Sequence, residues 1–264
     1  MAETAAEALR AGDPARALAL VMEEVRAAPA ALGPRLALFR IACIEGQWDR
    51  ARRALEAIAG LDPETAMFAR LYTALIGAEA ERAAVFAGAG PPVTLGAPPA
   101  FVAHLVQALR HEAAGEGEAA AAQRRAALEG AEAVPGELDG ADFAWLMDAD
   151  ARFGPCLELV VHGRYRWLPL ERLRELRTDG PRDLEDVVWL PVTLTLAGGE
   201  EVAAHLPGRY PGTETAGEPL ARLGRATLFD TAGRGLGGRL LASDRGDRPL
   251  LAVRRIRLGA AGHG

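Results

Sequence analysis

Side chains that could support chemistry are concentrated between residues 143 and 212, where carboxylates recur beside tryptophans, tyrosines and arginines. Asp148 and Asp150 flank a single residue, and Glu158, Asp183 and Asp186 could converge on them. A carboxylate cluster of this kind can bind Mg²⁺ or Ca²⁺, or can supply a general acid and a general base. The candidate cluster consists of Trp145, Asp148, Asp150, Arg152, Glu158, Tyr165, Trp167, Asp183, Asp186, Trp189, Arg209 and Tyr210.

A structural role explains the same acids without catalysis. Arginines alternate with them along the stretch, and aspartate commonly holds turns. We expect Arg152 and Arg209 to bind carboxylates of the cluster. Asp183 and Asp186 have the spacing of a capping box, in which two residues satisfy each other's backbone N–H groups. The interpretation that we favour is a protein-binding or structural cluster, with no catalytic residue, no cofactor and no metal.

The tryptophans of the cluster fit this structural interpretation. Large aromatic side chains contribute much of the buried area in cores and interfaces. We therefore expect Trp145, Trp167 and Trp189 to be largely buried. We also expect them to anchor a β-rich second half of the chain to the last helices that precede it.

Other enzyme signatures are weak. The chain has no lysine, which excludes Schiff-base chemistry through lysine. Ser243 is its only serine and lacks a surrounding G-x-S-x-G motif. Cys156 follows a Gly-Pro pair and enters a predicted strand, so we interpret it as a core thiol rather than a nucleophile. These observations favour a protein that is not an enzyme.

Composition and charge indicate which kinds of partner and which cellular location to expect. The chain has 264 residues and a formal net charge of −6, whereas binding to a phosphate backbone needs a basic face. We therefore expect no nucleic acid as partner. No stretch reaches the ~18 apolar residues of a membrane span, and the N-terminus lacks the pattern of a secretory signal. We expect a cytoplasmic protein that does not contact a membrane.

The first half predicts helices throughout and contains an internal repeat of 34 residues, the period of the tetratricopeptide helix–turn–helix unit. Gly12 and Gly46 would end the first helix of each unit, and Pro29 and Pro63 would end the second. Stacked units need about three copies to bury a continuous core. We therefore expect later helices to complete the stack, near Pro63–Ala87, Pro99–Ala114 and Glu116–Ala133.

Beyond a join near Val134–Gly140 the hydrophobic period changes to that of strands. A hairpin is predicted from Cys156–Val161 and Arg164–Leu168, with His162 and Gly163 as its turn. The other predicted elements are a hairpin of Val192–Leu196 and Val202–Leu206, a short helix at Leu170–Leu176, and strands at Arg225–Phe229, Arg239–Ala242 and Leu250–Leu258. The predicted class is α+β. A tetratricopeptide-like helical domain (1–135) is followed by a mostly antiparallel β domain with short helices (136–264).

Four motifs follow one another in the second half. They are DADARFGPCLE at Asp148–Glu158, RYRWLP at Arg164–Pro169, PRDLEDVVWLP at Pro181–Pro191 and RYPGTE at Arg209–Glu214. With these motifs in this order, the sequence resembles the ImpE family, also called TagJ, whose members are accessory proteins of type VI secretion. The resemblance covers the second half nearly end to end, and a helical first half suits the family too.

The resemblance implies a cytoplasmic adaptor without enzymatic activity. Family members are associated with the TssB-type sheath small subunit and with the ClpV-type ATPase that takes contracted sheath apart. The adaptor would present an N-terminal helix to the N-terminal domain of the ATPase. In this sequence that helix is Ala2–Arg10, with an apolar face of Ala5, Ala6 and Leu9.

Three alternatives stay open at this point. The N-terminal helix has a structural interpretation, as the first helix of the first repeat packed on the second. The whole chain could be a generic tetratricopeptide scaffold, because the repeats alone fit that function equally well. It could also be a carboxylate-dependent metal-binding enzyme that uses the cluster between Asp148 and Asp186.

Overall fold

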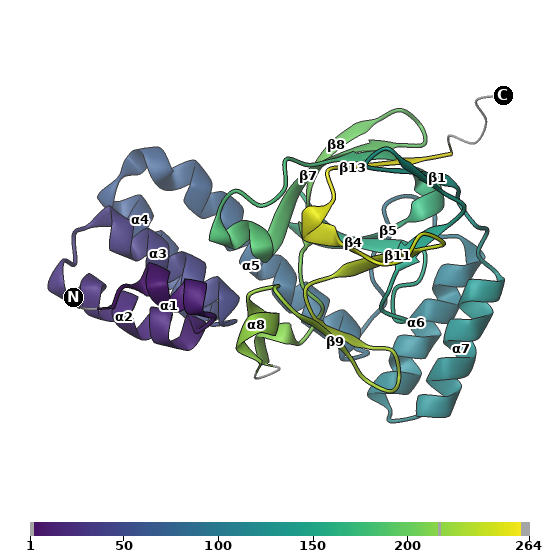
Figure 1. Ribbon diagram of the computed structural model, residues 1–264, viewed down its shortest axis with the longest axis horizontal. Coiled ribbons are helices and arrows are strands. Elements are labelled where there is room, and N and C mark those ends of the chain that lie inside the picture. Colours follow the sequence, from purple (N-terminus) through teal and green to yellow (C-terminus); the bar gives the residue numbers. More distant parts are fainter. Residues whose placement is uncertain (1–2, 216–217, 260–264) are drawn as a thin grey trace.

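The computed structural model describes residues 3–215 and 218–259 (Figure 1). Helices fill the first half and antiparallel strands the second, so the predicted α+β class is confirmed. The helices are α1 (Ala5–Ala11), α2 (Pro14–Ala27), α3 (Leu32–Ile44), α4 (Trp48–Leu61), α5 (Ala66–Phe86), α6 (Ala100–Ala113), α7 (Gly117–Glu129) and α8 (Pro219–Arg222). None of the described helices is both long and apolar enough to cross a membrane.

The repeat folds as two helix–turn–helix pairs, α1–α2 and α3–α4. Gly12 and Gly46 follow the first helix of each pair with φ of 86° and 65°, a left-handed conformation that favours glycine. Ala17 and Ala51 are fully buried, which lets neighbouring helices approach closely. The local signals of the repeat therefore correctly predict where these helices end.

The expectation that later helices complete the stack holds for α5, which packs on α4, and is wrong for α6 and α7. The 21 residues of α5 carry the chain out of the stack and along the β half (Figure 1). The hairpin of α6 and α7 lies at the opposite end of the molecule from α1–α4. Its inner face, with Phe101, Leu105 and Leu109, shares a core with Phe153 of the β half. The helices α1–α4 thus form repeats, whereas α6 and α7 pack against the β half.

The strands form a large antiparallel sheet and two small ones. In the large sheet the order is β2-β1-β13-β6-β7-β8-β4-β5, and in the small sheets it is β12-β11-β3 and β10-β9. The strands are β1 (Gly136–Leu138), β2 (Ala141–Phe143), β3 (Leu146–Asp148), β4 (Cys156–Val161), β5 (Arg164–Pro169), β6 (Leu173–Arg177), β7 (Trp189–Leu196), β8 (Glu201–Pro207), β9 (Thr227–Phe229), β10 (Gly235–Gly237), β11 (Leu240–Ser243), β12 (Arg248–Pro249) and β13 (Arg255–Leu258).

Both predicted hairpins are present, as β4–β5 and β7–β8. His162 and Gly163 have positive φ, as a two-residue hairpin turn requires. The helix predicted at Leu170–Leu176 is wrong, because only Leu170–Arg172 is helical, as a 3-10 turn, and the rest is β6. A register shift between Leu173 and Glu175 in β6 places Leu173 and Leu176 in the same core, although they are three residues apart. A helix-like spacing of leucines therefore arises from a bulged strand.

Other differences are smaller. The join near Val134–Gly140 already contains β1, and the three-residue strands β1, β2 and β3 are too short to show a period. The strand predicted at Leu250–Leu258 begins as a 3-10 turn, Leu250–Ala252, and becomes β13 at Arg255. The division into domains at 135/136 stays a prediction.

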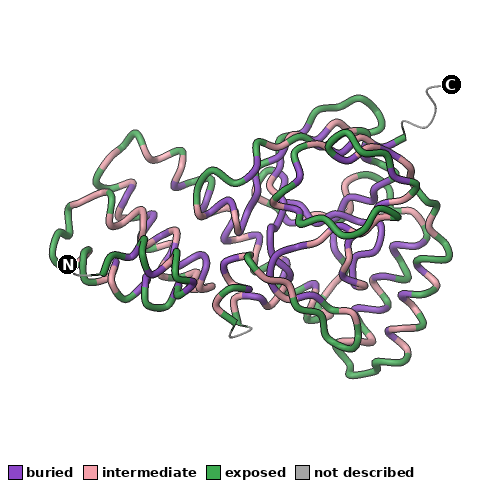
Figure 2. Tube along the Cα trace, in the orientation of Figure 1, coloured by how far each residue is buried: buried purple, intermediate pink, exposed green. Residues whose placement is uncertain are grey.

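Strand β4 is buried on both faces and separates the two main cores. Leu157, Leu159 and Val161 pack in the interior of the β half. Cys156 and Val160 point the other way, into the core that β4 shares with the helices. The alternation follows from the two-residue period of a strand. Figure 2 shows buried residues concentrated where α5 meets the sheet.

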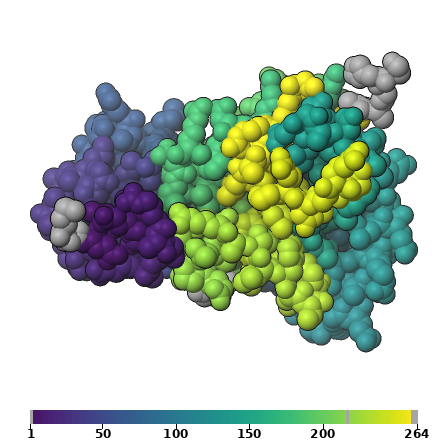
Figure 3. All heavy atoms as spheres, in the orientation of Figure 1, coloured from purple at the N-terminus to yellow at the C-terminus, as the bar shows by residue number. Residues whose placement is uncertain are grey.

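The first helices also contact the segment around α8. In Figure 3 the atoms of the N-terminal helices lie against the yellow-green segment that contains α8. Arg225, just after α8, donates a hydrogen bond of 2.9 Å to the carbonyl oxygen of Leu9 in α1. Leu220 of α8 packs beside Gly12, where a Cβ would lie 2.8 Å from its side chain. The helical stack therefore rests on the β half at more than one place.

Candidate functional site

Glu158 is the centre of a buried ion network between the helical half and the β half. It points from β4 to α5, where Arg82 donates a hydrogen bond of 2.8 Å to each carboxylate oxygen. Such bidentate arginine–carboxylate pairs are strong and directional. Burial alone would raise the pKa of Glu158, but the positive charges of Arg82 and Arg239 lower it to about 2. The carboxylate is therefore ionised at neutral pH.

Two aromatic residues of β5 extend this network. The hydroxyl group of Tyr165 donates a hydrogen bond to Glu158 and accepts one of 2.6 Å from Nε1 of Trp167. Burial, followed by the charge of Glu158, holds the pKa of Tyr165 well above its usual range. The phenol therefore stays protonated and serves as a donor to the carboxylate.

Arg239, immediately before β11, links Glu158 to a second acid, Asp148. Its guanidinium group pairs with Glu158 and lies 3.1 Å from Oδ2 of Asp148. The same group lies over the ring of Phe153 at 4.4 Å and over that of Tyr210 at 5.3 Å. Aromatic faces attract cations, so these contacts add to the ion pairs. Arg239 is only 1% exposed and acts as an interior tie.

Asp148 is incompletely satisfied in the network. Its Oδ1 accepts hydrogen bonds from the Tyr210 hydroxyl at 3.0 Å and from the backbone N–H of Asp150 at 2.8 Å. Its Oδ2 has no well-oriented hydrogen bond from the described residues, although Arg239 is close. Burial raises the pKa of Asp148 to about 7, against the lowering effect of Arg239. This carboxyl group therefore titrates near neutral pH.

Asp150 and Arg152 form the ion pair that we expect for Arg152. Nε of Arg152 lies 3.0 Å from both oxygens of Asp150. The acid also accepts backbone N–H groups from Arg152 at 2.8 Å and from Gly235 at 2.7 Å. Asp150 thus holds its own loop and fastens it to β10.

Arg209 binds no carboxylate of residues 3–215 or 218–259, so that expectation is wrong. Among the residues that the structure describes, it donates hydrogen bonds to the backbone carbonyl oxygens of Ile44 at 2.8 Å, Cys43 at 3.2 Å and Arg222. These carbonyl groups belong to the C-terminal ends of α3 and α8, where oxygens lack partners within the helix. Burial lowers the pKa of Arg209. Arg209 therefore caps the C-terminal ends of two helices, α3 and α8.

Trp167 and Trp189 are fully buried, as expected. Trp189 packs on Trp48 of α4, with ring centroids 5.8 Å apart, and its Nε1 donates a hydrogen bond of 2.8 Å to Glu79 of α5. Trp145 is less deeply buried than these two tryptophans and lies in the connection between β2 and β3. Trp189 therefore anchors the β half to α4 and α5 rather than to the last helices.

Asp183 and Asp186 belong to a separate set of contacts at the 3-10 helix η3 (Leu184–Val187). The predicted capping box between them is present. Asp183 also pairs with Arg40 of α3 at 2.8 Å, and Arg40 pairs with Glu185 at 2.7 Å. The five acids therefore do not converge on one site. Asp148, Asp150 and Glu158 belong to the central network, whereas Asp183 and Asp186 lie at η3, which contacts the helical stack.

These contacts argue against the metal-dependent enzyme. Arginines or backbone N–H groups occupy the acids of the candidate cluster. Within residues 3–215 and 218–259, no group of three or more His, Cys, Asp or Glu side chains is placed to hold a metal ion. The ion pairs and hydrogen bonds of this arrangement hold the two halves of the molecule together.

Sequence reasoning missed several members of the network. Arg82 and Arg239 are 76 and 81 residues from Glu158 in the chain, and spacing carries no signal over that distance. Glu79 lies on the same helix face as Arg82, three residues before it, and this spacing was the one available signal for it. Phe153 lies inside the motif Asp148–Glu158, and its position between candidate residues could have identified it.

The candidate ATPase-binding helix is α1, and Ala2 lies outside the described residues. Ala5 is buried, Leu9 is half-buried against other apolar side chains, and Ala6 is exposed. Thr4 and Glu7 form a capping box at the start of α1. The apolar face of Ala5 and Leu9 is therefore used inside the fold, as the structural interpretation of this helix expects.

Comparison with known proteins agrees with this architecture. The family model described as "ImpE protein" matches residues 140–257. A curated relative, "Type VI secretion system accessory component TagJ" of Pseudomonas aeruginosa, is 44% identical over 256 residues, which cover 97% of this chain and 91% of the relative. A crystal structure of a Vibrio parahaemolyticus protein shares the fold, with a TM-score of 0.87 at 23% identity over 96% of this chain and 97% of that one. The extent and identity of the match to the curated relative show that this chain belongs to the ImpE family.

Proposed function

We propose that the protein is a non-enzymatic adaptor of the type VI secretion system. It binds the TssB-type sheath small subunit and the N-terminal domain of a ClpV-type ATPase, and so assists disassembly of contracted sheath in the cytoplasm. The observation that carries the proposal is the 44% identity to a type VI secretion accessory component over 97% of this chain. Because the match includes both halves, the accessory role extends to the whole chain.

The interior of the molecule supports a binding role rather than a catalytic one. The acids of the candidate cluster join α5 to β4 and β11, and η3 to α3. Such ties hold the helical stack in a fixed orientation on the β half. An adaptor benefits from this rigidity, because surfaces that are already ordered lose less entropy when a partner binds.

For the ATPase we propose a contact through the exposed face of α1. Ala6 and Arg10 are exposed on this helix, whereas Ala5 and Ala8 are buried against α2 and α3. Presentation of the opposite face would require α1 to leave the stack. The exposed face can dock without that cost, and Ala6 is small enough to allow close approach of a partner helix.

The test is calorimetric titration of the intact protein with the purified sheath small subunit and, separately, with the ATPase N-terminal domain. Ala6→Asp places a charge on the exposed face of α1, and Ala15→Asp is the matched control on α2. We expect both partners to bind, with affinity for the ATPase domain at least tenfold lower in Ala6→Asp and unchanged in Ala15→Asp. If neither partner binds the folded wild-type protein, the adaptor role is wrong.

A further inference from the structure

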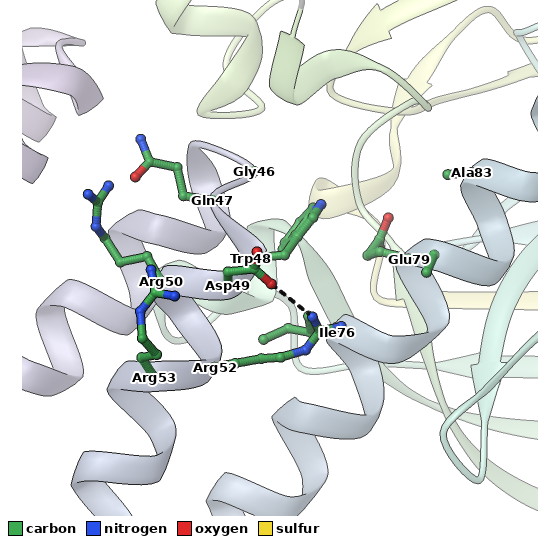
Figure 4. A pocket seen from close by; sticks show the side chains of 11 residues that line it. Gly46, Gln47, Trp48, Asp49, Arg50, Arg52, Arg53, Ile76, Glu79 and Ala83 are labelled. Atoms are coloured by element: carbon green, nitrogen blue, oxygen red, sulfur yellow. Dashed lines mark hydrogen bonds and ion pairs between the residues drawn. The ribbon is translucent and has the colours of Figure 1, made fainter.

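A groove of about 470 Å³ lies between the start of α4 and the middle of α5, beside the buried network, with which it shares Glu79 (Figure 4). Its volume is within the ~300–1,000 Å³ typical of ligand pockets. One wall is the turn Gly46–Gln47 with the first two turns of α4. The other wall is α5, from Ile76 to Ala83.

The α5 side of the groove is apolar and hollow. The half-buried ring of Trp48 extends from the start of α4 toward Glu79, and Ile76 lies below it. Ala80 and Ala83 are exposed here, so no large side chain of α5 fills the space. Glu79 already accepts the Nε1–H of Trp189 and pairs with Arg82. This side can receive an apolar side chain of a ligand.

The α4 side is basic and partly uncompensated. Arg52 pairs with Asp49 at 3.2 Å. Arg50 and Arg53 lie together beside Gln47 in Figure 4, and neither has an ion pair or side-chain hydrogen bond with any residue in 3–215 or 218–259. The chain as a whole carries a net charge of −6. This site therefore presents positive charge against an acidic background.

We propose that the α4–α5 groove binds a short acidic segment of a partner protein. An apolar side chain of that segment packs on Trp48 and Ala80, and its carboxylates pair with Arg50 and Arg53. Guanidinium groups match carboxylates in shape and in hydrogen-bond geometry, and arginines without an internal partner can do so without first breaking an ion pair. The inference deepens the proposed adaptor role and rests on it only in assuming a protein partner.

A nucleic acid fits the groove less well than a peptide does. Nucleic-acid binding uses an extended basic face that neutralises many phosphates, and this groove offers two uncompensated arginines. Its apolar side also favours a ligand that carries both an apolar side chain and an acid. These two properties occur together in peptides that contain leucine or phenylalanine beside aspartate or glutamate.

The test needs no secretion component, so its failure is distinct from failure of the adaptor role. A phage-displayed library of random 12-residue peptides is selected on the full-length protein and depleted on the double variant Arg50→Glu/Arg53→Glu. Enriched peptides are synthesised with a fluorescent label and titrated by anisotropy, with a 12-nucleotide single-stranded DNA as a second probe. The matched control is Arg110→Glu/Arg125→Glu, which reverses two exposed arginines on α6 and α7.

We expect the enriched peptides to combine acidic and apolar residues. They should bind wild type and the control pair equally, and bind Arg50→Glu/Arg53→Glu at least tenfold more weakly. A second variant, Ala83→Leu, fills the hollow without changing charge and should also weaken binding. Thermal denaturation verifies that every variant is folded. The proposal is overturned if no acidic peptide is enriched, if the peptides bind the reversed variant as well as wild type, or if the DNA binds more tightly than the peptides.

Discussion

Arginine serves opposite purposes in two regions of this molecule. Around Glu158, Arg82 and Arg239 are buried and paired with carboxylates. In the α4–α5 groove, Arg50 and Arg53 contact solvent, and neither pairs with a carboxylate of the described residues. The difference follows from solvation. A buried guanidinium group without a partner costs several kcal/mol, whereas an exposed one is hydrated and stays available to a ligand.

The comparison separates residues that hold the fold from residues that meet a partner. A chain whose basic residues are all arginine gives no such distinction in its sequence. Burial and pairing supply it, and they predict that the two groups of arginines respond differently to substitution. Changes in the interior should alter stability, and changes in the groove should alter binding.

The largest effect on stability is expected for Glu158→Gln. The amide keeps the shape of the side chain but leaves Arg82 and Arg239 without their shared negative charge. Loss of one partner from a buried ion pair costs about 3–5 kcal/mol in the free energy of unfolding. Urea denaturation measures it. Glu201→Gln is the control, because its pair with Arg177 is exposed and contributes roughly 0–1 kcal/mol. Equal urea midpoints for the two variants would contradict the assignment of Glu158 as an interior tie.

A smaller loss is expected for Trp189→Phe. The substitution keeps an aromatic ring against Trp48 but removes the N–H that Glu79 accepts. Leaving a buried acceptor without its donor costs about 1–3 kcal/mol. Trp145→Phe provides the comparison, since Trp145 is only half-buried and its Nε1 donates no side-chain hydrogen bond among the described residues, so its loss should be smaller. Thermal midpoints of both variants, measured side by side, should therefore separate the two tryptophans.

Local signals predicted much of the fold. Gly12 and Gly46 identify helix ends because a left-handed residue is a property of the turn itself. His162 and Gly163 identify a hairpin for the same reason. The bulged strand β6 was misread because its inward leucines repeat every three residues, and only pairing with β7 reveals the extra residue.

The candidate site was only partly predictable. Acids and aromatic residues of the cluster lie in one stretch of sequence, and composition alone identifies them. Their partners are Arg82 of α5 and Arg239, just before β11, which only the fold brings together. The prediction that Arg209 binds a carboxylate failed for the same reason. Arg209 instead donates to carbonyl oxygens at helix ends, and the sequence does not reveal which helix ends lie near it. Long-range pairing is therefore what the sequence leaves open.

The two acids of the network should respond to pH in opposite directions. Asp148 has a pKa raised to about 7, above the ~3.9 of an unfolded aspartate, so its stabilising contribution is present at low pH and is lost as pH rises toward 7. Glu158, with a pKa lowered to about 2, contributes above pH ~4.3 and loses that contribution as pH falls. We expect Asp148→Asn to remove a decline in urea midpoint between about pH 4 and pH 7, the interval between the unfolded and folded pKa values. Exposed Asp247→Asn should retain the decline, and a flat wild-type profile would contradict the prediction.

The smallest effect on stability is expected in the groove. Arg50→Ala/Arg53→Ala removes one half-buried and one exposed side chain, neither with an ion pair among the described residues, so the free energy of unfolding should change by no more than about 0.5 kcal/mol for each. The same measurement on Arg82→Ala should show a loss of several kcal/mol, because Glu158 and Glu79 lose a buried partner. A large loss in the groove variant would mean that these arginines hold the fold. The groove arginines would then not differ in role from the buried ones, and the argument for a peptide site at α4–α5 would fail.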